Sequence, residues 1–268
     1  MATATSNKAK IAKRVIEVLE FFDEDHPEAT VMDIVRRFNR PQSSTSELLS
    51  SLVDLGLLYK DPCSRSYAPT PRAAMLGSAV QPCVVRDGRL TGMIERLSAQ
   101  TGIGVAVFGM VGLTVQIFCW KSGKRMLRTS APEGFGGGQI EHLSESAAGW
   151  LLLSTVAQPR REGMIRRLNA EASPERKFLP AEMTARVQLC REQGQSSGLA
   201  GFGSIADMTA ILLPGQPENR PLAIGFVYEP SAQIDTAALL QSLNNAVERC
   251  VNEQAVQPMP VQQLFNAA

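Results

Sequence analysis

The stretch from Thr30 to Tyr67, TVMDIVRRFNRPQSSTSELLSSLVDLGLLYKDPCSRSY, decides how the N-terminal part of the chain folds. It predicts two short helices separated by a tight turn and followed by a two-stranded hairpin. Thr30 is placed to cap the first helix, because its hydroxyl can accept a free backbone N–H of the first turn. Asn39-Arg40-Pro41 ends this helix, because the residue before a proline avoids the helical region. Pro41 then suits the first position of the second helix.

The second helix has one apolar face and one polar face. Its leucines recur at helical spacing, as expected for a helix that packs on a core; they are Leu48, Leu49, Leu52 and Leu55. Gly56 is expected to end the helix in the left-handed conformation. Residues 57–60 and 66–68 predict two strands around the turn 61–65. Together these elements predict a winged helix-turn-helix domain.

The composition allows two domains and gives little general attraction to nucleic acid. The chain has 268 residues, enough for two domains with separate cores. A hydrophobic fraction of 44% and a charged fraction of 20% are ordinary for a globular protein. The net charge is only +1, so no global basic field draws the chain to nucleic acid. This counts against DNA binding and has to be weighed against the helix-turn-helix pattern.

Cysteine and histidine usage limits metal chemistry. Five cysteines are scattered and form no C-x-x-C motif, which suits a reducing cytosol. Only His26 and His142 are available, so metal sites and histidine-based triads are poorly supplied. The N-terminal MATATSNKAK lacks the apolar core of a signal peptide. We therefore expect a cytoplasmic protein with no metal and no cofactor.

The uncharged stretch from Thr101 to Trp120 could be mistaken for a membrane span. A spanning helix needs about 20 predominantly apolar residues, and this stretch is interrupted by four glycines and by Gln116. We expect two short strands here and no membrane contact.

Periodicity divides the remaining chain into helices and strands. Helices are expected at residues 8–22, 71–80, 82–100, 144–153, 163–169, 180–193 and 235–252. Strands are expected at 105–108, 113–120, 125–129, 203–206, 209–213 and 222–228. This order predicts an α+β fold. We expect domains at 1–70 and 102–252, linker helices at 71–101, and a disordered tail at 253–268.

Four segments resemble motifs of the IclR family of bacterial transcription regulators. PQSSTSELLSSLVDLGLL at 41–58 resembles the family's recognition helix, and IERLSAQTGIGVAVF at 94–108 resembles the end of its linker helix and the strand after it. HLSESAAGWLLLS at 142–154 and REQGQ at 191–195 resemble a later helix start and a turn. The resemblance runs from about Lys8 to Asn252, with the motifs in the family's order.

The resemblance implies a winged DNA-binding domain, a linker helix and a GAF-like mixed α/β domain that binds a small effector. It also implies a homodimer or a dimer of dimers, with a double-stranded DNA operator as partner. The chain departs from the family at Glu47, where arginine or another DNA-contacting residue is usual, and at Trp150, where lysine is usual. Residues 196–201 replace an acid-rich segment. We therefore expect an effector pocket unlike that of the better-known members.

The polar face of the second helix is the expected DNA-reading surface. A recognition helix enters the major groove with its N-terminus first. There glutamine can pair with adenine, and glutamate can accept from cytosine N4. The alternative is a winged helix that contacts protein. The expected DNA-contacting residues are Arg40, Gln42, Ser43, Ser44, Ser46, Glu47, Ser50, Lys60 and Arg65.

The C-terminal domain offers apolar candidates for an effector pocket. Phe118 and Trp120 lie at alternate positions of one expected strand, so we expect their rings to face the same side. Few polar anchors and no arginine pair favour a small, aromatic or apolar organic effector. Each candidate is alternatively plain core. The expected effector-binding residues are Phe108, Phe118, Trp120, Met126, Ala148, Trp150, Ile205, Asp207 and Met208.

Two other functions stay open. An enzyme on the C-terminal domain is disfavoured, because no nucleophile stands beside a base in the sequence. A ligand-blind DNA binder with a degenerate effector domain is the second alternative. For assembly, we expect a dimer whose seam uses Leu90, Ile94 and Leu97 of the linker helix, exposed before pairing.

Overall fold

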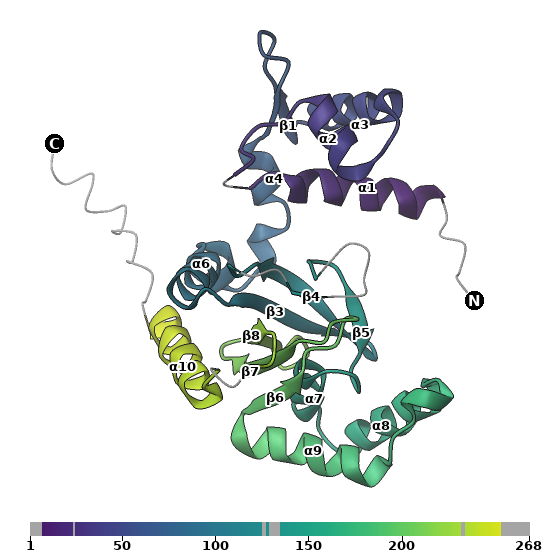
Figure 1. The fold of residues 1–268 in the computed structure, drawn as a ribbon, viewed down its shortest axis with the longest axis vertical. Coiled ribbons are helices and arrows are strands. Elements are labelled where there is room, and N and C mark those ends of the chain that lie inside the picture. The colour runs from purple at the N-terminus through teal and green to yellow at the C-terminus, as the bar shows by residue number, and fades with distance from the viewer. Residues whose placement is uncertain (1–6, 24, 125–126, 129–134, 232–233, 253–268) are drawn as a thin grey trace, which may run out of the picture. The chain divides into compact units, whose positions relative to one another are not determined.

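The computed structural model describes residues 7–23, 25–124, 127–128, 135–231 and 234–252 (Figure 1). The chain divides into two compact units, residues 1–81 and 82–268. No helix within the described ranges is both long and apolar enough to cross a membrane. The expected tail at 253–268 and most of the expected strand 125–129 lie outside the described residues.

The N-terminal unit has the winged helix-turn-helix fold that the sequence predicts. Its elements are α1 (Asn7–Phe21), α2 (Val31–Phe38), α3 (Gln42–Asp54), β1 (Leu58–Lys60), β2 (Tyr67–Pro69), α4 (Pro71–Met75) and the 3-10 turn η1 (Ser78–Val80). β1 and β2 pair antiparallel to form the wing. The single helix expected at 71–80 is wrong, because Leu76 is extended and Gly77 has a φ of 73°.

The end signals of α2, and Gly56 after α3, act as predicted, but Pro41 precedes α3 with a ψ of 135° and does not occupy its first helical position. The Thr30 hydroxyl accepts the N–H of Asp33, and the Asp33 carboxylate accepts from the N–H and the hydroxyl of Thr30. These hydrogen bonds from Thr30 hold the pKa of Asp33 below its usual value. Asn39 ends α2 in the left-handed region with a φ of 48°. Gly56 follows the end of α3 with a φ of 70°.

The apolar face of α3 forms the core of this unit. Leu49 and Leu52 are buried together with Ile34 of α2 and Tyr67 of the wing. The expectation that Leu55 belongs to this face is wrong. Leu55 caps the C-terminal end of α3 and is 62% exposed, because the helix has already ended.

The C-terminal unit is built on one six-stranded antiparallel sheet (Figure 1). The strand order is β5-β4-β3-β8-β7-β6. The strands are β3 (Gly104–Val111), β4 (Thr114–Lys121), β5 (Ile140–His142), β6 (Gln195–Leu199), β7 (Asp207–Leu213) and β8 (Leu222–Tyr228). Neighbouring residues point to opposite faces. Ala106 and Phe108 therefore belong to one core, and Val105 and Val107 belong to the other.

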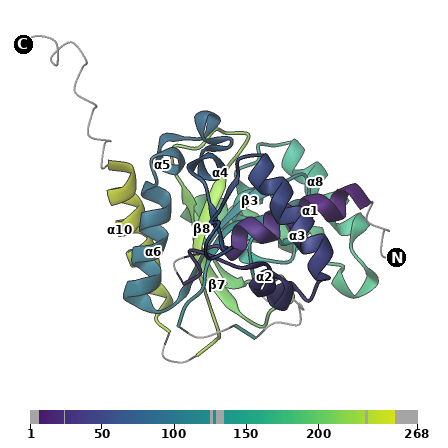
Figure 2. The same ribbon diagram turned by 90° about the horizontal axis from the view of Figure 1, so that it is seen from above.

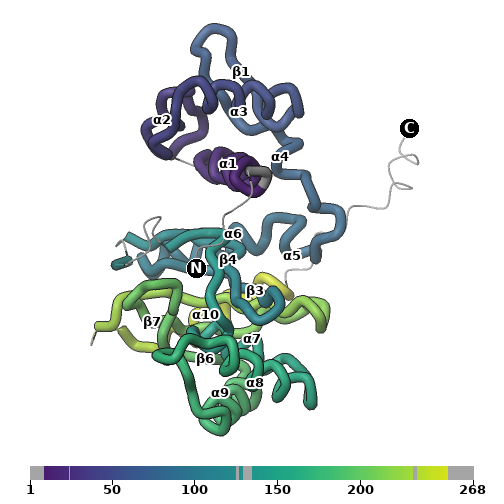
Figure 3. The backbone as a smooth tube through the Cα atoms, turned by 90° about the vertical axis from the view of Figure 1, so that its right-hand side faces the viewer, coloured from purple at the N-terminus to yellow at the C-terminus, as the bar shows by residue number. Residues whose placement is uncertain are grey.

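Helices cover both faces of the sheet. α6 (Arg89–Thr101) and α10 (Thr236–Asn252) lie side by side on one face, with the short α5 (Cys83–Arg86) beside them (Figure 2). We call this the α6 face. α7 (Ala147–Ser154), α8 (Arg160–Glu171) and α9 (Pro180–Gln193) cover the other face, which we call the α7 face (Figure 3). The 3-10 turn η2 (Pro174–Arg176) joins α8 to α9. Helices packed on an antiparallel sheet confirm the α+β class.

The sequence does not predict the two edge strands. β5 has only three residues, and β6 reads QSSGL, without a run of alternating apolar residues. The strand expected at 203–206 is wrong, since this segment lies outside the ladder between β6 and β7. Edge strands this short and polar carry little of the periodicity from which strands are recognised.

Several helix ends also differ from the expectation. The helix expected at 82–100 is split into α5 and α6 by Asp87 and Gly88, and Gly88 has a φ of 77°. α8 begins at Arg160 rather than at 163. Ser146 rather than Ser144 caps α7, because its hydroxyl accepts the N–H of Gly149 at 3.1 Å.

The apolar stripe of α6 is used inside the chain. Leu90, Ile94 and Leu97 are 7%, 2% and 2% exposed and pack in the core of the α6 face. The expectation that these residues form an exposed dimer seam is therefore wrong. Their partners are the sheet and α10, which sequence periodicity alone does not identify.

A β-bulge reverses the faces along β4. Val107 pairs with Cys119, but Phe108 pairs with Ile117, so Phe118 is an extra residue between two ladder positions. Side chains along a strand alternate between the two faces of the sheet, and an extra residue of this kind shifts that alternation by one position. Residues before and after Phe118 therefore do not follow a single period of two.

The bulge places Phe118 and Trp120 on opposite faces. A Cβ atom at Gly109 would lie 2.1 Å from the Phe118 ring, and one at Gly104 would lie 2.1 Å from the Trp120 ring. Gly104 and Gly109 are an odd number of residues apart on β3 and face opposite sides. The expectation that the two rings share a face is wrong, and Phe118 is 51% exposed.

Candidate functional sites

The polar face of α3 is open to solvent. Gln42, Ser43, Glu47 and Ser50 are exposed, and Ser44 and Ser46 are half-buried. The helix is oriented by its opposite side, where Thr45 is buried and donates its hydroxyl to the Pro41 carbonyl at 3.0 Å. The predicted DNA-contacting residues of α3 thus share one accessible surface.

The first turn of α3 offers backbone donors to an anion. Pro41 precedes the helix and makes no side-chain cap. The first N–H groups of a helix have no carbonyl partner within it. Those of Gln42, Ser43 and Ser44 therefore form an N-terminus suited to a phosphate oxygen.

Positive charge is scarce around α3. The helix contains no Lys or Arg, and residues 1–81 carry ten Lys and Arg against ten Asp and Glu. Arg40 forms an ion pair with Glu17 of α1, and its guanidinium lies 5.4 Å from the Phe38 ring centre. This places Arg40 in the packing between α1 and the turn before α3.

The wing carries the remaining predicted contacts. Lys60 and Arg65 are exposed, and the Lys60 ammonium lies 5.6 Å from the Tyr67 ring centre. Asp61 fixes the tip, because its Oδ1 accepts the N–H groups of Cys63 at 2.6 Å and Ser64 at 3.0 Å. These backbone hydrogen bonds, from Ser64 first, hold the pKa of Asp61 below its usual value.

The α7 face gathers part of the predicted effector set. Phe108, Trp120, Ala148, Trp150 and Met208 pack in its core. The other predicted residues lie elsewhere. Phe118 and Asp207 occupy strand positions that face away from the α7 side of the sheet. Ile205 precedes β7 and is 56% exposed, and Met126 lies outside the described residues.

Four aromatic rings fill the centre of the α7 face. Phe108 stacks on Phe202 with ring centres 6.1 Å apart. Phe202 meets Phe135 edge-on at 5.4 Å, and Phe135 meets Trp120 at 4.7 Å. The sequence reading missed Phe135 and Phe202. The signal available was the Gly-Phe-Gly triplet that occurs around each of them, at 134–136 and 201–203.

Phe202 has a strained backbone. Its φ is 55°, and its side chain is only 4% exposed. A non-glycine residue in this region crowds its Cβ against a carbonyl oxygen, at a cost of about 1–2 kcal/mol. The Phe202 N–H donates to Glu141 Oε2 at 3.1 Å, and Glu141 Oε1 lies 3.5 Å from Arg176 Nη1.

Trp150 occupies the wall between α7 and α9. Its indole N–H donates to the Ser144 carbonyl at 2.8 Å, and the Arg186 guanidinium lies 4.2 Å from its ring centre. The Ser144 hydroxyl is buried and, among the described residues, has no hydrogen-bond partner.

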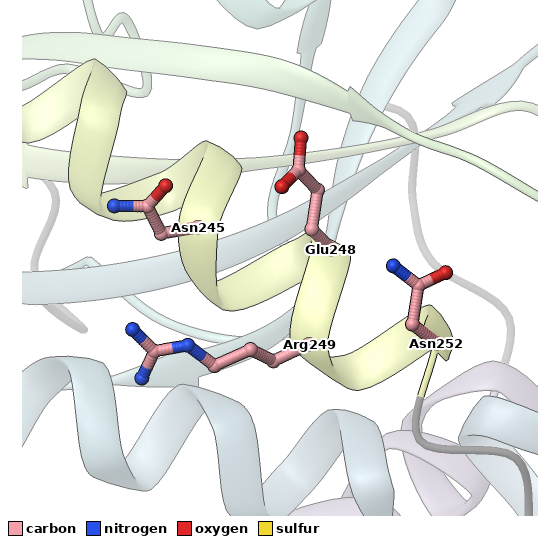
Figure 4. A pocket seen from close by; sticks show the side chains of 4 residues that line it. All are labelled: Asn245, Glu248, Arg249 and Asn252. Atoms are coloured by element: carbon pink, nitrogen blue, oxygen red, sulfur yellow. The ribbon is translucent and has the colours of Figure 1, made fainter.

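A shallow hollow of about 460 Å³ lies against the C-terminal half of α10 (Figure 4). It is lined by Asn245, Glu248, Arg249 and Asn252, which recur at helical spacing on one polar side. None of the predicted effector residues lines it. In the described ranges no group of three or more His, Cys, Asp or Glu side chains is arranged to hold a metal ion.

The part of the chain from α1 to the wing matches a family model. Residues 12–62 match the IclR helix-turn-helix domain. This segment is an IclR helix-turn-helix domain. It contains α2, α3 and β1, and the match ends at residue 62, before β2 of the wing.

Solved structures share the fold of the chain. An IclR transcriptional regulator from Alicyclobacillus acidocaldarius has a TM-score of 0.55 at 17% identity, over 90% of this chain and 96% of that one. An IclR homolog from Microbacterium hydrocarbonoxydans, complexed with 4-hydroxybenzoate, has a TM-score of 0.53 at 17% identity, over 90% and 97%. The Thermotoga maritima IclR has a TM-score of 0.52 at 15% identity, over 90% and 97%. No curated protein matches the chain.

The IclR helix-turn-helix domain and the shared fold identify a DNA-binding transcription regulator. The similar proteins are transcriptional regulators rather than enzymes. At 15–17% identity, these matches describe the fold and not the compound that a C-terminal domain binds.

Proposed function

We propose that α3 of this regulator reads a specific operator sequence and that the C-terminal domain senses a small organic molecule with aromatic or apolar character. The observation that carries the DNA half is the exposed polar face of α3 in an IclR helix-turn-helix domain. Gln42 would pair with a base edge, Ser43 would bond to a base or phosphate, and Glu47 would accept from cytosine.

The Gln42→Ala/Ser43→Ala double variant tests base reading. Each lost base contact costs about 1–3 kcal/mol, so the variant should bind DNA from the chain's own upstream region roughly tenfold or more weakly. Gln193→Ala changes an exposed glutamine of α9 in the other unit and serves as the control. Gel-shift titrations measure all three proteins. Wild-type binding by the double variant would show that α3 does not read bases.

The interior of the α7 face supports the effector half. It is filled by packed aromatic rings and by Met208. Such surroundings favour an aromatic or apolar ligand over a multiply charged acid, which needs several cationic partners. The similar regulator from Microbacterium hydrocarbonoxydans is complexed with 4-hydroxybenzoate, which supports the same class of ligand here.

A ligand screen tests the effector half. Thermal-shift and tryptophan-fluorescence measurements would compare phenols, aromatic acids and apolar metabolites with small di- and tricarboxylates. A ligand changes DNA affinity only by binding the DNA-competent and incompetent arrangements unequally. DNA binding is therefore measured with each hit. Hits confined to di- and tricarboxylates, or hits that leave DNA affinity unchanged, would contradict this proposal.

Operator reading by one short helix calls for a second copy of the chain. Two-fold dimers place two reading helices on half-sites about 10 bp apart or at multiples of that spacing. The buried stripe of α6 does not supply the seam, but Met75, Leu76 and Val80 are 68%, 58% and 78% exposed. We propose these residues for the dimer contact. A monomer by light scattering at micromolar concentration, with full operator affinity, would contradict it.

A ligand-blind regulator is the second candidate. The packing of Phe202 among the other rings of the α7 face favours it, because the place of a ligand is filled by the chain itself. Native mass spectrometry of the purified protein, before and after addition of screened compounds, separates the two candidates. A bound compound supports a sensor, whereas an unchanged mass with every compound supports the ligand-blind regulator.

A further inference from the structure

We infer that the ring of Phe202 stands where the effector's ring binds, and that the effector is a neutral aromatic molecule with a hydrogen-bond donor, as in a phenol. This inference rests on the effector half of the proposed function. It names the ligand class and the group of the chain that the ligand displaces.

Phe202 holds the central place in a row of rings. Its ring stacks on Phe108, with an angle of 25° between the planes, and meets the edge of Phe135. Phe135 in turn contacts Trp120. Rings at these separations attract any aromatic group in the same place. Withdrawal of Phe202 leaves a space the size of a benzyl group between Phe108 and Phe135.

The backbone around Phe202 favours its release. Gly201, Phe202 and Gly203 have φ values of 78°, 55° and 67°. Glycine adopts such values freely, but phenylalanine is strained there. Strain of this kind persists only where surrounding contacts impose it, and it is concentrated at ligand sites and switch regions. A ligand that replaces the ring contacts lets Phe202 leave the strained conformation.

Glu141 decides which polar group the ligand carries. Its Oε2 accepts the Phe202 N–H at 3.1 Å. Movement of Phe202 removes this donor, and a carboxylate oxygen left without one in a partly buried place is costly. A phenol hydroxyl restores the hydrogen bond, whereas a ligand carboxylate is repelled. Arg176 offers little compensation to an acid, because it already pairs with Glu141 and with Glu145 at 3.7 Å.

A second buried polar group, the Ser144 hydroxyl, lies in a turn on which the Phe202 loop packs. The Ser144 hydroxyl lies in the turn that leads into α7 and has no partner among the described residues. The Phe202 loop packs on this turn, because a Cβ atom at Gly201 would lie 3.1 Å from the Ser146 Cβ and 3.3 Å from the Glu145 carbonyl oxygen. A second small polar group of the ligand, if placed on this turn, would find a donor and an acceptor in the Ser144 hydroxyl.

Phe202→Ala tests the inference with phenol as the probe. Calorimetric titration of the whole chain without DNA should show phenol binding at least about tenfold more tightly to the variant than to wild type. The reason is that wild type binds only in the fraction of molecules whose ring has moved out. Benzoate should bind more weakly than phenol to both proteins. Equal phenol affinities, no phenol binding by the variant, or a preference for benzoate would overturn the inference.

Phe226→Ala is the matched cavity control. Phe226 is fully buried on the α6 face and loses the same side chain. If it binds phenol as tightly as Phe202→Ala does, any new cavity suffices and the inference is overturned. Weak or absent binding by this control supports a dedicated site.

A structure of wild type with phenol decides the matter if Phe202→Ala does not fold. A displaced Phe202 with the phenol hydroxyl on Glu141 supports the inference, and phenol bound elsewhere with Phe202 in place overturns it. These measurements need no DNA. A chain that binds phenol as expected but ignores its upstream DNA would therefore contradict only the DNA half of the proposed function.

Discussion

α3 and the α7 face hold their functional groups in opposite ways. α3 leaves Gln42, Ser43 and Glu47 exposed, so the DNA-reading surface that we propose is accessible without rearrangement. The α7 face buries Phe108 and Phe202 against each other, so the ligand that we propose would replace contacts that the chain already makes. DNA reading therefore depends on which side chains are present. The proposed ligand sensing would depend on the difference in free energy between ring contacts within the chain and contacts with the ligand, and single residues do not reveal this difference.

Leu49→Ala should give the largest difference in stability between the two units. Leu49 is fully buried in the N-terminal core, and truncation of such a leucine costs about 2–5 kcal/mol. DNA binding should be lost, and circular dichroism should show an early unfolding transition. Both tryptophans, Trp120 and Trp150, lie in the other unit. Tryptophan fluorescence should therefore keep the wild-type transition.

Leu152→Ala in α7 is the matched variant for this comparison. Leu152 is fully buried on the α7 face, so its truncation should lower the transition seen by tryptophan fluorescence. If Leu49→Ala lowers the fluorescence transition as well, the two units unfold together and the separation fails.

Arg40→Ala tests whether Arg40 stabilises the N-terminal unit or contacts DNA. Its side chain is 22% exposed and bonds to Glu17, so the variant should lose about 1–2 kcal/mol of stability. Glu17→Ala should lose a similar amount, and the double variant should lose less than the sum. Denaturant unfolding measures all three. If Arg40→Ala lost DNA affinity but kept its stability, Arg40 would be a DNA-contacting residue, as the sequence predicts.

Glu47→Gln removes a negative charge from the reading face. One charge near a phosphate in water is worth about 1 kcal/mol, or roughly fivefold in affinity. Non-specific DNA binding should rise by this amount, and preference at one base position should flatten. Asp54→Asn, at the far end of α3, removes an equal charge and serves as the control. An unchanged binding-site selection would place Glu47 away from the bases.

Acid should loosen the wing tip, and this is the smallest effect expected. The folded pKa of Asp61 is lowered, so its contribution is fully present above the unfolded pKa of about 3.9 and is lost as the pH falls through the folded pKa. NMR signals of the Cys63 and Ser64 amides should therefore change only below about pH 4. A change centred well above that pH would assign the turn to another group.

The sequence predicted the N-terminal unit well because its signals are local. Thr30, Asn39 and Gly56 lie directly at the helix ends that they determine. Leu49 and Leu52 mark their own buried face. Each inference needed only residues within one or two turns of each other.

The effector region was predicted poorly because its decisive features are non-local. The bulge at Phe118 follows from the pairing of β4 with β3, and it separates Phe118 from Trp120. The ring row joins Phe108, Phe135 and Phe202 from three separate segments. Periodicity identifies each as apolar but does not bring them together. The prediction of a dimer seam on the apolar stripe of α6 failed for the same reason, because α10 and the sheet cover that stripe.

A reading helix without Lys or Arg has a consequence for the ionic strength of the surroundings. DNA affinity falls with salt by a slope of about −0.9 for each phosphate that a protein neutralises, because bound counterions are released. With Arg40 held by Glu17, the exposed cations from α2 to the wing are Arg36, Arg37, Lys60 and Arg65, and Arg36 lies 3.8 Å from Asp33. Few counterions are then released when the operator is bound. Occupancy of the operator should therefore depend less on salt than it does for a regulator with a basic reading helix, so changes in the ionic strength of the cell would disturb it less.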